Sequence, residues 1–279
     1  MTTEEARTLI GGISADQAHA KRARAMLLSM VRTLRLSILR VVSYLNSPDE
    51  DGGFWLPHIP RSFVGSQEQI CRLFDSILRQ YPIGTFLIWK TTAAVPRRKF
   101  IDHFREAHRD RLEDFRMPAS KRTTCLVLDG QQRLQSLCIG LRGSYEHREL
   151  YLDILSGEAA APGEMKFKFR FLDPRTATFP HVRVKDLALS GDTPRVIVNS
   201  IVEKAGRTLA TTEIDRIRDL VALVSDAFRN ESGIGYQEVD SIDHPTRYTD
   251  EDIAEIISAR ERRRDALGQG RHGVHPSCV

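Results

Sequence analysis

The sequence predicts an α+β protein with a mixed sheet core, flanking helices and a mainly helical C-terminal part. The short β-rich runs GTFLIWK and TTCLVLD each adjoin a segment with helical periodicity, and the further strand-like runs ELYLDIL and MKFKFRFLD follow them. After HVRVKDL the pattern becomes mainly helical, as in TTEIDRIRDLVALVSDAFRN. With 279 residues and 41% hydrophobic content, the chain can bury a large core.

The composition is that of a globular protein and does not by itself indicate a function. The formal charge of +4 does not by itself indicate a nucleic-acid binder, although local basic patches could still attract an anionic ligand. The four cysteines have no paired metal-ligand spacing and no secretory leader precedes them, so we expect reduced thiols in a cytoplasmic protein. They are Cys71, Cys125, Cys138 and Cys278.

The segment AMLLSMVRTLRLSILRVVSYL is the most apolar stretch of the chain. Arg32, Arg35 and Arg40 interrupt it, which excludes a membrane span. Its apolar residues recur at helical spacing, and we predict one helix that packs on the core of the protein. They are Leu27, Val31, Leu34, Ile38, Val41, Val42 and Leu45.

Turn residues and periodicity predict the neighbouring elements. NSPDEDGG is a turn-rich linker, FWLPHIPRSFVG is extended, and SQEQICRLFDSILRQ is a helix with Ser66 as its N-cap. The charged insertion at residues 91–122 should be a surface loop with a helix. Towards the C-terminus, GYQEVDSID should be a strand and TDEDIAEIIS a capped helix.

The box Asp-Gly-Gln-Gln-Arg, residues 129–133, stands where the TTCLVLD strand runs directly into a helix. Gly130 permits a tight turn there, and the amides that follow would form an anion site at a helix N-terminus. Arg133 could grip phosphate oxygens with two donors at once. Asp129 is the one member of the box that can accept a proton or hold a divalent cation. The alternative is an ordinary turn with a surface arginine.

LFDSILRQYPIGTFLIWK, followed by LVLDGQQRLQSLCIGLRGSYEHRELYLDILSG, resembles the N-terminal domain family of GmrSD-type modification-dependent restriction endonucleases. The resemblance covers roughly Phe54 to Ile257, and the box is the hallmark of that family. It implies a ParB/sulfiredoxin-like fold that binds and hydrolyses a nucleotide. In restriction and phage-defence systems this activity is coupled to DNA cleavage by a separate C-terminal HNH-type nuclease domain.

The resemblance also implies roles for individual residues. NTP and Mg²⁺ are the implied ligands, with Asp129 as the metal ligand. Asp129, Gln132 and Arg133 would be catalytic. The nucleotide would contact Arg61, Ser76, Pro82, Ile83, Gly84, Gly130 and Gln131. A sulfiredoxin reaction is excluded, because Gln131 stands where that box carries its nucleophilic cysteine.

Two stretches depart from the family pattern. In the entry segment, Pro60 replaces a glutamine and Gly65 replaces a tryptophan. At the C-terminus the Arg-rich tail replaces a segment like Val-Arg-x-Asn-x-Gly-Gly-Thr-x-Leu. Back-translation from Ala259, read one nucleotide later, can restore that segment, so we expect a frame shift there. The histidines and the cysteine of the tail would then form no metal site; they are His272, His275 and Cys278.

These observations predict a division of the chain and a function. We expect a helical extension and linker at 1–52, the ParB/sulfiredoxin-like core at 53–175, its mainly helical continuation at 176–258, and a frameshifted, disordered tail at 259–279. The predicted function is a nucleotide-binding, NTP-hydrolysing module of a restriction or phage-defence system without its nuclease. Its expected partners are a nucleotide, DNA and a separate nuclease domain or subunit, with no membrane. Two alternatives stay open: a ParB-like DNA-associated nucleotide switch without significant hydrolysis, and an inactive truncated remnant.

Overall fold

The computed structural model describes residues 32–47, 51–57, 63–108, 115–116, 123–158, 160–231, 233–243 and 253. The chain divides into two compact units, and the larger one, Thr33–Gln237, contains the helices and strands described below except for Arg32 and residues 238–240. The other unit combines residues 1–32 with 238–279. No helix in the described ranges is long and apolar enough to cross a membrane.

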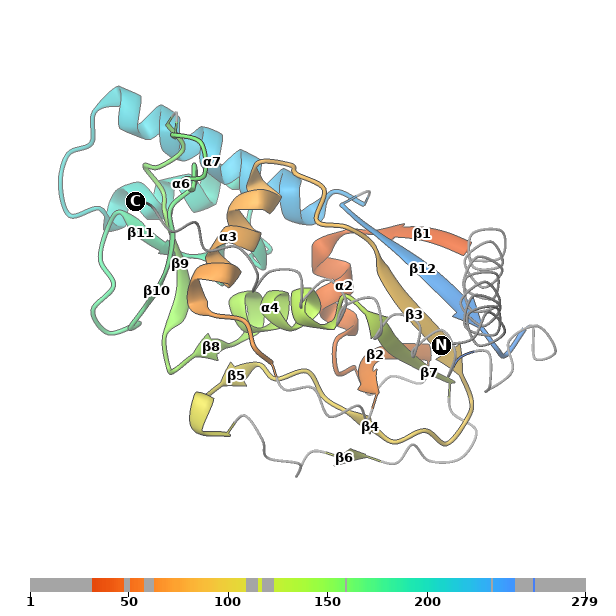
Figure 1. Cartoon of the computed structure of the whole chain (residues 1–279). Helices are drawn as coiled ribbons and strands as arrows, with labels where there is room; N and C mark the ends of the chain where they lie inside the picture. Colours follow the sequence, from red (N-terminus) through yellow and green to blue (C-terminus); the bar gives the residue numbers. More distant parts are fainter. Residues whose placement is uncertain are drawn as a thin grey trace, which may run out of the picture. The chain divides into compact units, whose positions relative to one another are not determined.

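The strands form a mixed seven-stranded sheet and two small sheets (Figure 1). The large sheet has the order β1-β12-β3-β7-β2-β4-β6, in which β7 pairs with β2 in parallel and with β3 antiparallel. The three-stranded sheet has the order β10-β9-β11, and β5 pairs with β8. The bounds are β1 Arg32–Leu36, β2 Asp51–Pro57, β3 Phe86–Thr91, β4 Arg97–Arg98, β5 His103–Phe104, β6 Phe115–Arg116, β7 Thr123–Asp129, β8 Ser144–Tyr145, β9 Glu149–Asp153, β10 Phe169–Leu172, β11 His181–Arg183 and β12 Ile234–Asp240.

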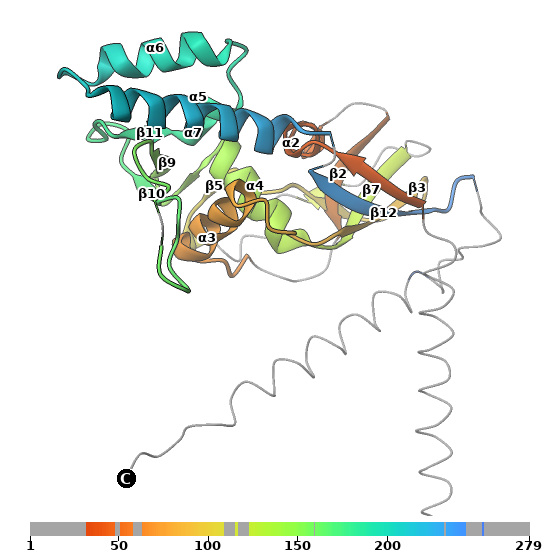
Figure 2. The same ribbon diagram turned by 90° about the horizontal axis from the view of Figure 1, so that it is seen from above.

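Six α-helices and one 3₁₀ turn are described, and the longest helix, α7, joins the others. It contacts α2, α3, α5 and α6, and Figure 2 shows α6 lying along its outer side. α4 packs in turn against α2, α3 and α5. The bounds are α2 Ile38–Tyr44, α3 Gln67–Leu78, η1 Glu106–His108, α4 Gln131–Arg142, α5 Val184–Ala188, α6 Pro194–Lys204 and α7 Thr211–Arg229. The predicted α+β class with a mixed sheet is confirmed.

Both faces of the central strands are buried. Alternate residues of a strand point to opposite faces, and one set joins the helices in the main hydrophobic core. This set comprises Phe54, Leu56, Phe86, Ile88, Cys125 and Val127. The other set is buried as well and comprises Trp55, Leu87, Trp89 and Leu126. On that second face, the Arg97 guanidinium stacks 4.2 Å from the Trp55 ring and donates to the Thr124 hydroxyl over 2.7 Å.

The predicted single helix across residues 25–45 is wrong at residues 32–36 and confirmed at residues 38–44. Residues 32–36 form strand β1, and a helix begins only at Ile38. Ser37 separates the two elements, because its side chain accepts a hydrogen bond from the Arg40 amide and caps α2. The apolar residues at 34, 36 and 38 fit a period of two as well as a helical stripe, so periodicity alone was ambiguous.

Most of the other predicted elements are confirmed. Ser66 caps α3 in a full capping box. Its hydroxyl accepts a hydrogen bond from the backbone amide of Gln69, and the Gln69 side-chain oxygen accepts one from the backbone amide of Ser66. β10 alternates as predicted, with Phe169 and Phe171 buried and Arg170 exposed. The charged insertion, predicted to be a surface loop with a helix, differs in its described parts: they form the short strands β4, β5 and β6 and the 3₁₀ turn η1, and they bury Phe100 and Phe104 in the core. The helix predicted near residue 253 lies outside the described residues apart from Ile253.

A buried carboxylate fastens α3 to the chain before β10. The Asp75 side chain accepts a hydrogen bond from the backbone amide of Phe167 over 2.8 Å and lies 3.4 Å from the Arg79 guanidinium. Asp75 is 5% exposed, so water cannot replace a lost acceptor for that amide.

Replacing Asp75 should therefore destabilise the fold. We expect Asp75→Ala to lower the free energy of unfolding by about 1–3 kcal/mol, the usual cost of an unsatisfied buried donor. Asp215→Ala is the matched control, because Asp215 forms an exposed pair with Arg218 and its loss should change the same quantity by less than about 0.5 kcal/mol. Urea unfolding of the two variants measures the difference, and equal losses would contradict the role given to Asp75.

Candidate functional site

Sheet topology brings together two segments that lie more than 40 residues apart in the sequence. β3 and β7 are antiparallel neighbours, with Leu87 opposite Asp129. The start of β3 therefore lies beside the end of β7. As a result the loop before β3, residues 82–85, meets the box at the N-terminus of α4.

Gly130 makes the sharp change from strand to helix. It is the N-cap of α4 and adopts φ +84°, a left-handed conformation that costs other residues about 1–2 kcal/mol. A Cβ placed on Gly130 would lie 2.2 Å from a ring carbon of Phe86. Both the backbone angle and this close approach require glycine, as the sequence indicated for the turn.

Arg133 joins the box to the loop before β3. Its guanidinium donates hydrogen bonds to the backbone carbonyls of Ile83 and Thr85, the latter over 2.9 Å. The same group lies 4.9 Å from the centre of the Phe86 ring, within range of a cation–π interaction. Gly84, with φ +81°, leaves room for it, since a Cβ there would lie 2.5 Å from Nη1 of Arg133. Arg133 thus acts in this structure as a clamp between two segments.

The side chains of Gln131, Gln132 and Asp129 each form a hydrogen bond with the backbone of a different residue. Gln131 donates through Nε2 to the carbonyl of Val127, over 2.8 Å, and so ties α4 to β7. The Gln132 side-chain oxygen accepts from the Val64 amide over 3.2 Å, which brings the entry segment to the same helix end. Asp129 accepts from the Gly130 amide over 2.8 Å. Three chain segments therefore converge on the first turn of α4.

The structure places the remaining predicted site residues as follows. Pro82 is exposed in the loop that Arg133 clamps. Ser76 lies on α3, where its hydroxyl donates to the Arg72 carbonyl and its own carbonyl accepts from Tyr81 at the end of the helix. Arg61 lies outside the described residues.

Two residues near the site were not predicted from the sequence. Gln135, 4% exposed, exchanges hydrogen bonds with both the amide and the carbonyl of Ile101 and so fixes the charged insertion to α4. Phe63, 5% exposed, packs edge to face on Phe104 with ring centres 5.1 Å apart. A Cβ built on Gly65 would lie 2.4 Å from a ring carbon of Phe63, so the Phe63 ring fills the space beside this glycine. Both contacts join residues that are more than 30 positions apart in the sequence, so no local sequence pattern predicts them.

The thiols near the site are unsuited to nucleophilic chemistry. Burial raises the pKa of Cys138, on α4, to about 12, and it raises the pKa of Cys71, on α3, to about 12. Both therefore stay protonated at neutral pH, and a protonated thiol is a poor nucleophile. Within the described ranges no group of three or more His, Cys, Asp or Glu side chains could hold a metal ion.

The N-terminus of α4 favours an anion, and the neighbouring Asp129 carboxylate opposes one. The N-terminus of a twelve-residue helix carries a partial positive charge, and its cap residue, Gly130, has no side chain to cover the first amides. Asp129 stands beside it as a half-buried carboxylate. Gln131 and Gln132 add polar groups that stay neutral at every pH.

The close packing of Gly84 against Arg133 can be tested. We expect the left-handed backbone at this position to make Gly84→Ala lower the free energy of unfolding by about 1–3 kcal/mol. A further loss should come from the collision of the new methyl group with the guanidinium of Arg133. Gly163→Ala is the control, since Gly163 has φ +88° with no atom within 4 Å of a built Cβ and loses only the backbone part.

The collision also predicts coupling between the two positions. Thermal or urea unfolding of Gly84→Ala, Arg133→Ala and the double variant should show that removing Arg133 relieves part of the cost of Gly84→Ala. Strictly additive losses would mean that the two residues do not contact each other in solution.

Comparison with known proteins identifies the family of the chain. No curated protein sequence matches the chain. A family model described as GmrSD restriction endonuclease, N-terminal domain, matches residues 42–264, which include the box, the clamped loop and the helices that follow. This match covers most of the chain, and the chain belongs to the GmrSD restriction endonuclease N-terminal domain family.

Proposed function

We propose that this chain is a nucleotide-binding and NTP-hydrolysing module of a modification-dependent restriction or phage-defence system. The observation that carries the proposal is the convergence of residues 64, 83–85 and 127–130 on the first turn of α4. Family membership supports a role in restriction. The geometry supports an anionic ligand, and phosphate groups are the anions that helix N-termini most often bind.

The first amides of α4 would hold phosphate oxygens. The helix dipole favours negative charge at this end, and the cap residue Gly130 has no side chain to hydrogen-bond the first amides. Gln132 holds the entry segment against the helix end, and that segment would help enclose the nucleotide.

Asp129 would bind Mg²⁺. One carboxylate is enough for this ion where phosphate oxygens and waters supply its other ligands, and the Gly130 amide fixes the orientation of the group. When bound, Mg²⁺ would neutralise charge on the phosphates. A water would attack the terminal phosphorus, the bond to the leaving nucleoside diphosphate would break, and the proton of the water would pass to the released phosphate.

Arg133 has a positioning role in this scheme. Two of the five N–H donors of a guanidinium are hydrogen-bonded to the carbonyls of Ile83 and Thr85. Through them Arg133 keeps the loop of Pro82, Ile83 and Gly84 against the end of α4, where it would contact the nucleotide.

The same clamp favours a second candidate function, a nucleotide switch without significant hydrolysis. A ligand that competed for the Arg133 donors would release the loop before β3, and the loop position would then report nucleotide binding. A switch of this kind would bind nucleotide tightly and turn it over negligibly.

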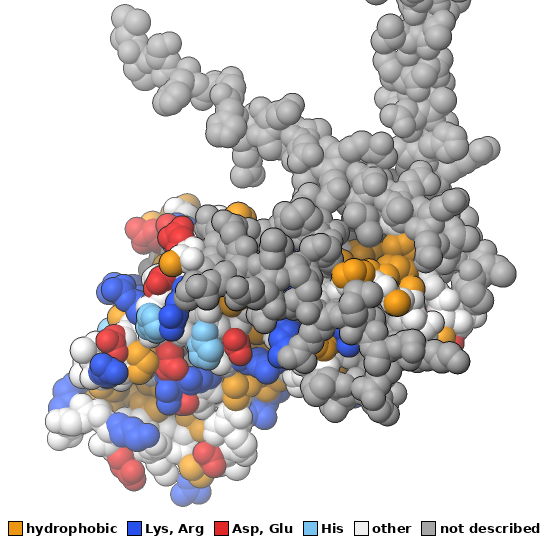
Figure 3. Space-filling model, turned by 90° about the horizontal axis from the view of Figure 1, so that it is seen from below, with side chains coloured by type: hydrophobic (Ala, Val, Ile, Leu, Met, Phe, Trp, Pro, Cys, Tyr) orange, Lys and Arg blue, Asp and Glu red, His pale blue; other side chains and the backbone are white. Residues whose placement is uncertain are grey.

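The proposal also covers the fold of the chain and its macromolecular partners. We propose a ParB/sulfiredoxin-like core at 53–175 with a helical continuation at 176–258, DNA as a partner, and a separate nuclease domain or subunit for cleavage. On the face in Figure 3, acidic and basic side chains are interspersed among histidines over the described part of the chain. That mixture does not favour this face for DNA, which would require a predominantly basic surface.

Turnover by box variants tests hydrolysis. We expect Asp129→Asn, which keeps the shape and the acceptor for Gly130 but removes the charge, to lower Mg²⁺-dependent NTP turnover about 10- to 100-fold. Asp226→Asn removes the same charge from an exposed position on α7 and should leave turnover unchanged. Arg133→Lys should also slow turnover, because lysine cannot bond both carbonyls in the same geometry.

The outcomes separate the candidate functions. Unchanged turnover in both Asp129→Asn and Arg133→Lys would contradict the proposed site. Nucleotide binding measured by calorimetry, without turnover either with or without DNA, would favour the switch. Absence of both binding and turnover in the wild-type chain would favour an inactive remnant.

A further inference from the structure

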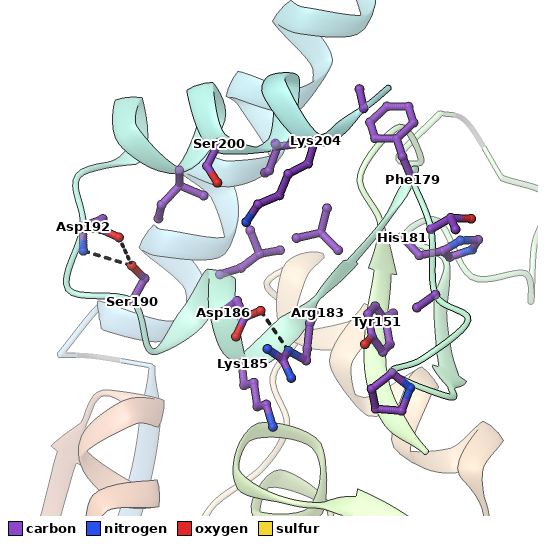
Figure 4. A pocket seen from close by; sticks show the side chains of 18 of the residues that line it. Tyr151, Phe179, His181, Arg183, Lys185, Asp186, Ser190, Asp192, Ser200 and Lys204 are labelled. Carbon is purple, nitrogen blue, oxygen red and sulfur yellow. Dashed lines mark hydrogen bonds and ion pairs between the residues drawn. The ribbon is translucent and has the colours of Figure 1, made fainter. Parts of the chain in front are cut away.

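A cavity of about 1140 Å³ lies between the three-stranded sheet and helices α5 and α6 (Figure 4). One wall is the edge strand β11, where the consecutive residues 181–183 all line the cavity. α5 and the turn after it form a second wall, and α6 forms the third. No residue of the Asp-Gly-Gln-Gln-Arg box lines it, so the cavity is distinct from the proposed nucleotide site. Small-molecule sites typically occupy about 300–1,000 Å³, so this space is ample for one.

Two large apolar side chains that line the cavity are exposed to solvent. Leu189 and Val196 are 47% and 50% exposed, and both lie on its wall. Large hydrophobic side chains with this exposure are few in the described part of the chain; the others are Val64 and Tyr81. Phe179 contributes an aromatic ring on the opposite side (Figure 4). Exposed apolar surface gathered in one hollow is typical of a ligand site.

Two of the cations in the wall are already neutralised. Arg183 bonds Glu149 and Asp186, each over 2.9 Å, and Lys185 also bonds Glu149. Burial alone would raise the pKa of Glu149, but hydrogen bonds from Lys185 and Arg183 together hold it below its usual value. Glu149 therefore stays ionised, and this cluster is a fixed part of the wall.

Lys204 differs from these two cations. It extends from α6 across the cavity in Figure 4, and Ser200, one turn earlier, points into the same space. Lys204 forms no ion pair with any residue that the structure describes. The wall also carries two carboxylates: Asp186 pairs with Arg183, and Asp192 accepts a hydrogen bond from the hydroxyl of Ser190. Lys204 forms an ion pair with neither of them, so its exposed ammonium group is placed to meet a negative charge on a ligand.

We propose that this cavity binds a small amphipathic anion. The ligand would place an apolar, ring-sized body against Phe179, Val196 and Leu189, and its single acidic group would accept hydrogen bonds from Lys204 and Ser200. The inference concerns a second site and does not depend on nucleotide binding at the box.

Fluorescence titration with 8-anilinonaphthalene-1-sulfonate tests the proposal, because this probe combines aromatic rings with one sulfonate. The full-length chain should bind it saturably at one site. Lys204→Ala should weaken binding about threefold to tenfold, the range for an exposed charge-assisted contact, and Lys204→Arg should restore it. Val196→Asp should weaken binding as well, since it places a negative charge on the apolar wall.

Matched variants control for general effects. Arg195→Ala removes the same charge from an exposed residue of α6 that does not line the cavity, and it should leave probe binding unchanged. Asp129→Asn should also leave it unchanged, which separates this test from the nucleotide site. Displacement of the probe by decanoate would assign an aliphatic ligand body, and displacement by 5′-dCMP a heteroaromatic one. Binding that does not saturate, or that is the same in Lys204→Ala and the wild type, would overturn the proposal.

Discussion

The hydrogen bonds from Arg133 to the carbonyls of Ile83 and Thr85 are the interaction on which the site depends. They connect the helix that carries the box to the loop that precedes β3, and the antiparallel β3–β7 pair holds the same two segments together from the sheet side. Glycines at 84 and 130 are required because the guanidinium and the Phe86 ring fill the space a side chain would need. A charged side chain, two glycines and an aromatic ring thus form one packed unit.

This unit explains why the box contains so many polar residues at a simple strand-to-helix turn. Gln131, Gln132 and Arg133 bond three different backbone segments, so each one has a structural task apart from any ligand. The same bonds leave the first turn of α4 at the centre of the junction. A ligand phosphate bound there would be surrounded by segments whose positions are already fixed, and preorganisation of this kind lowers the entropic cost of binding. Structural and functional roles of the box are therefore compatible.

Local signals predicted much of the fold, and non-local contacts explain what they missed. The capping box of Ser66 and Gln69 fixes the start of α3, and TTCLVLD forms β7 over the predicted residues. Residues 32–36 became a strand because their alternation fits both periodicities and partners elsewhere in the chain decide between them. The sequence singles out the box as a candidate site, but it could not predict the contact of Arg133 with residues 83–85, because that contact depends on the pairing of β3 with β7. Gln135 was missed for the same reason.

We propose the first turn of α4 as the nucleotide site. Amide chemical-shift mapping by NMR, on addition of a non-hydrolysable ATP analogue with Mg²⁺, tests it most directly. The largest shifts should fall on residues 130–133 and 83–85, and those of 83–85 should decline in Arg133→Lys. Shifts confined to the cavity between α5 and α6, or absent from 130–133 at saturating nucleotide, would contradict it.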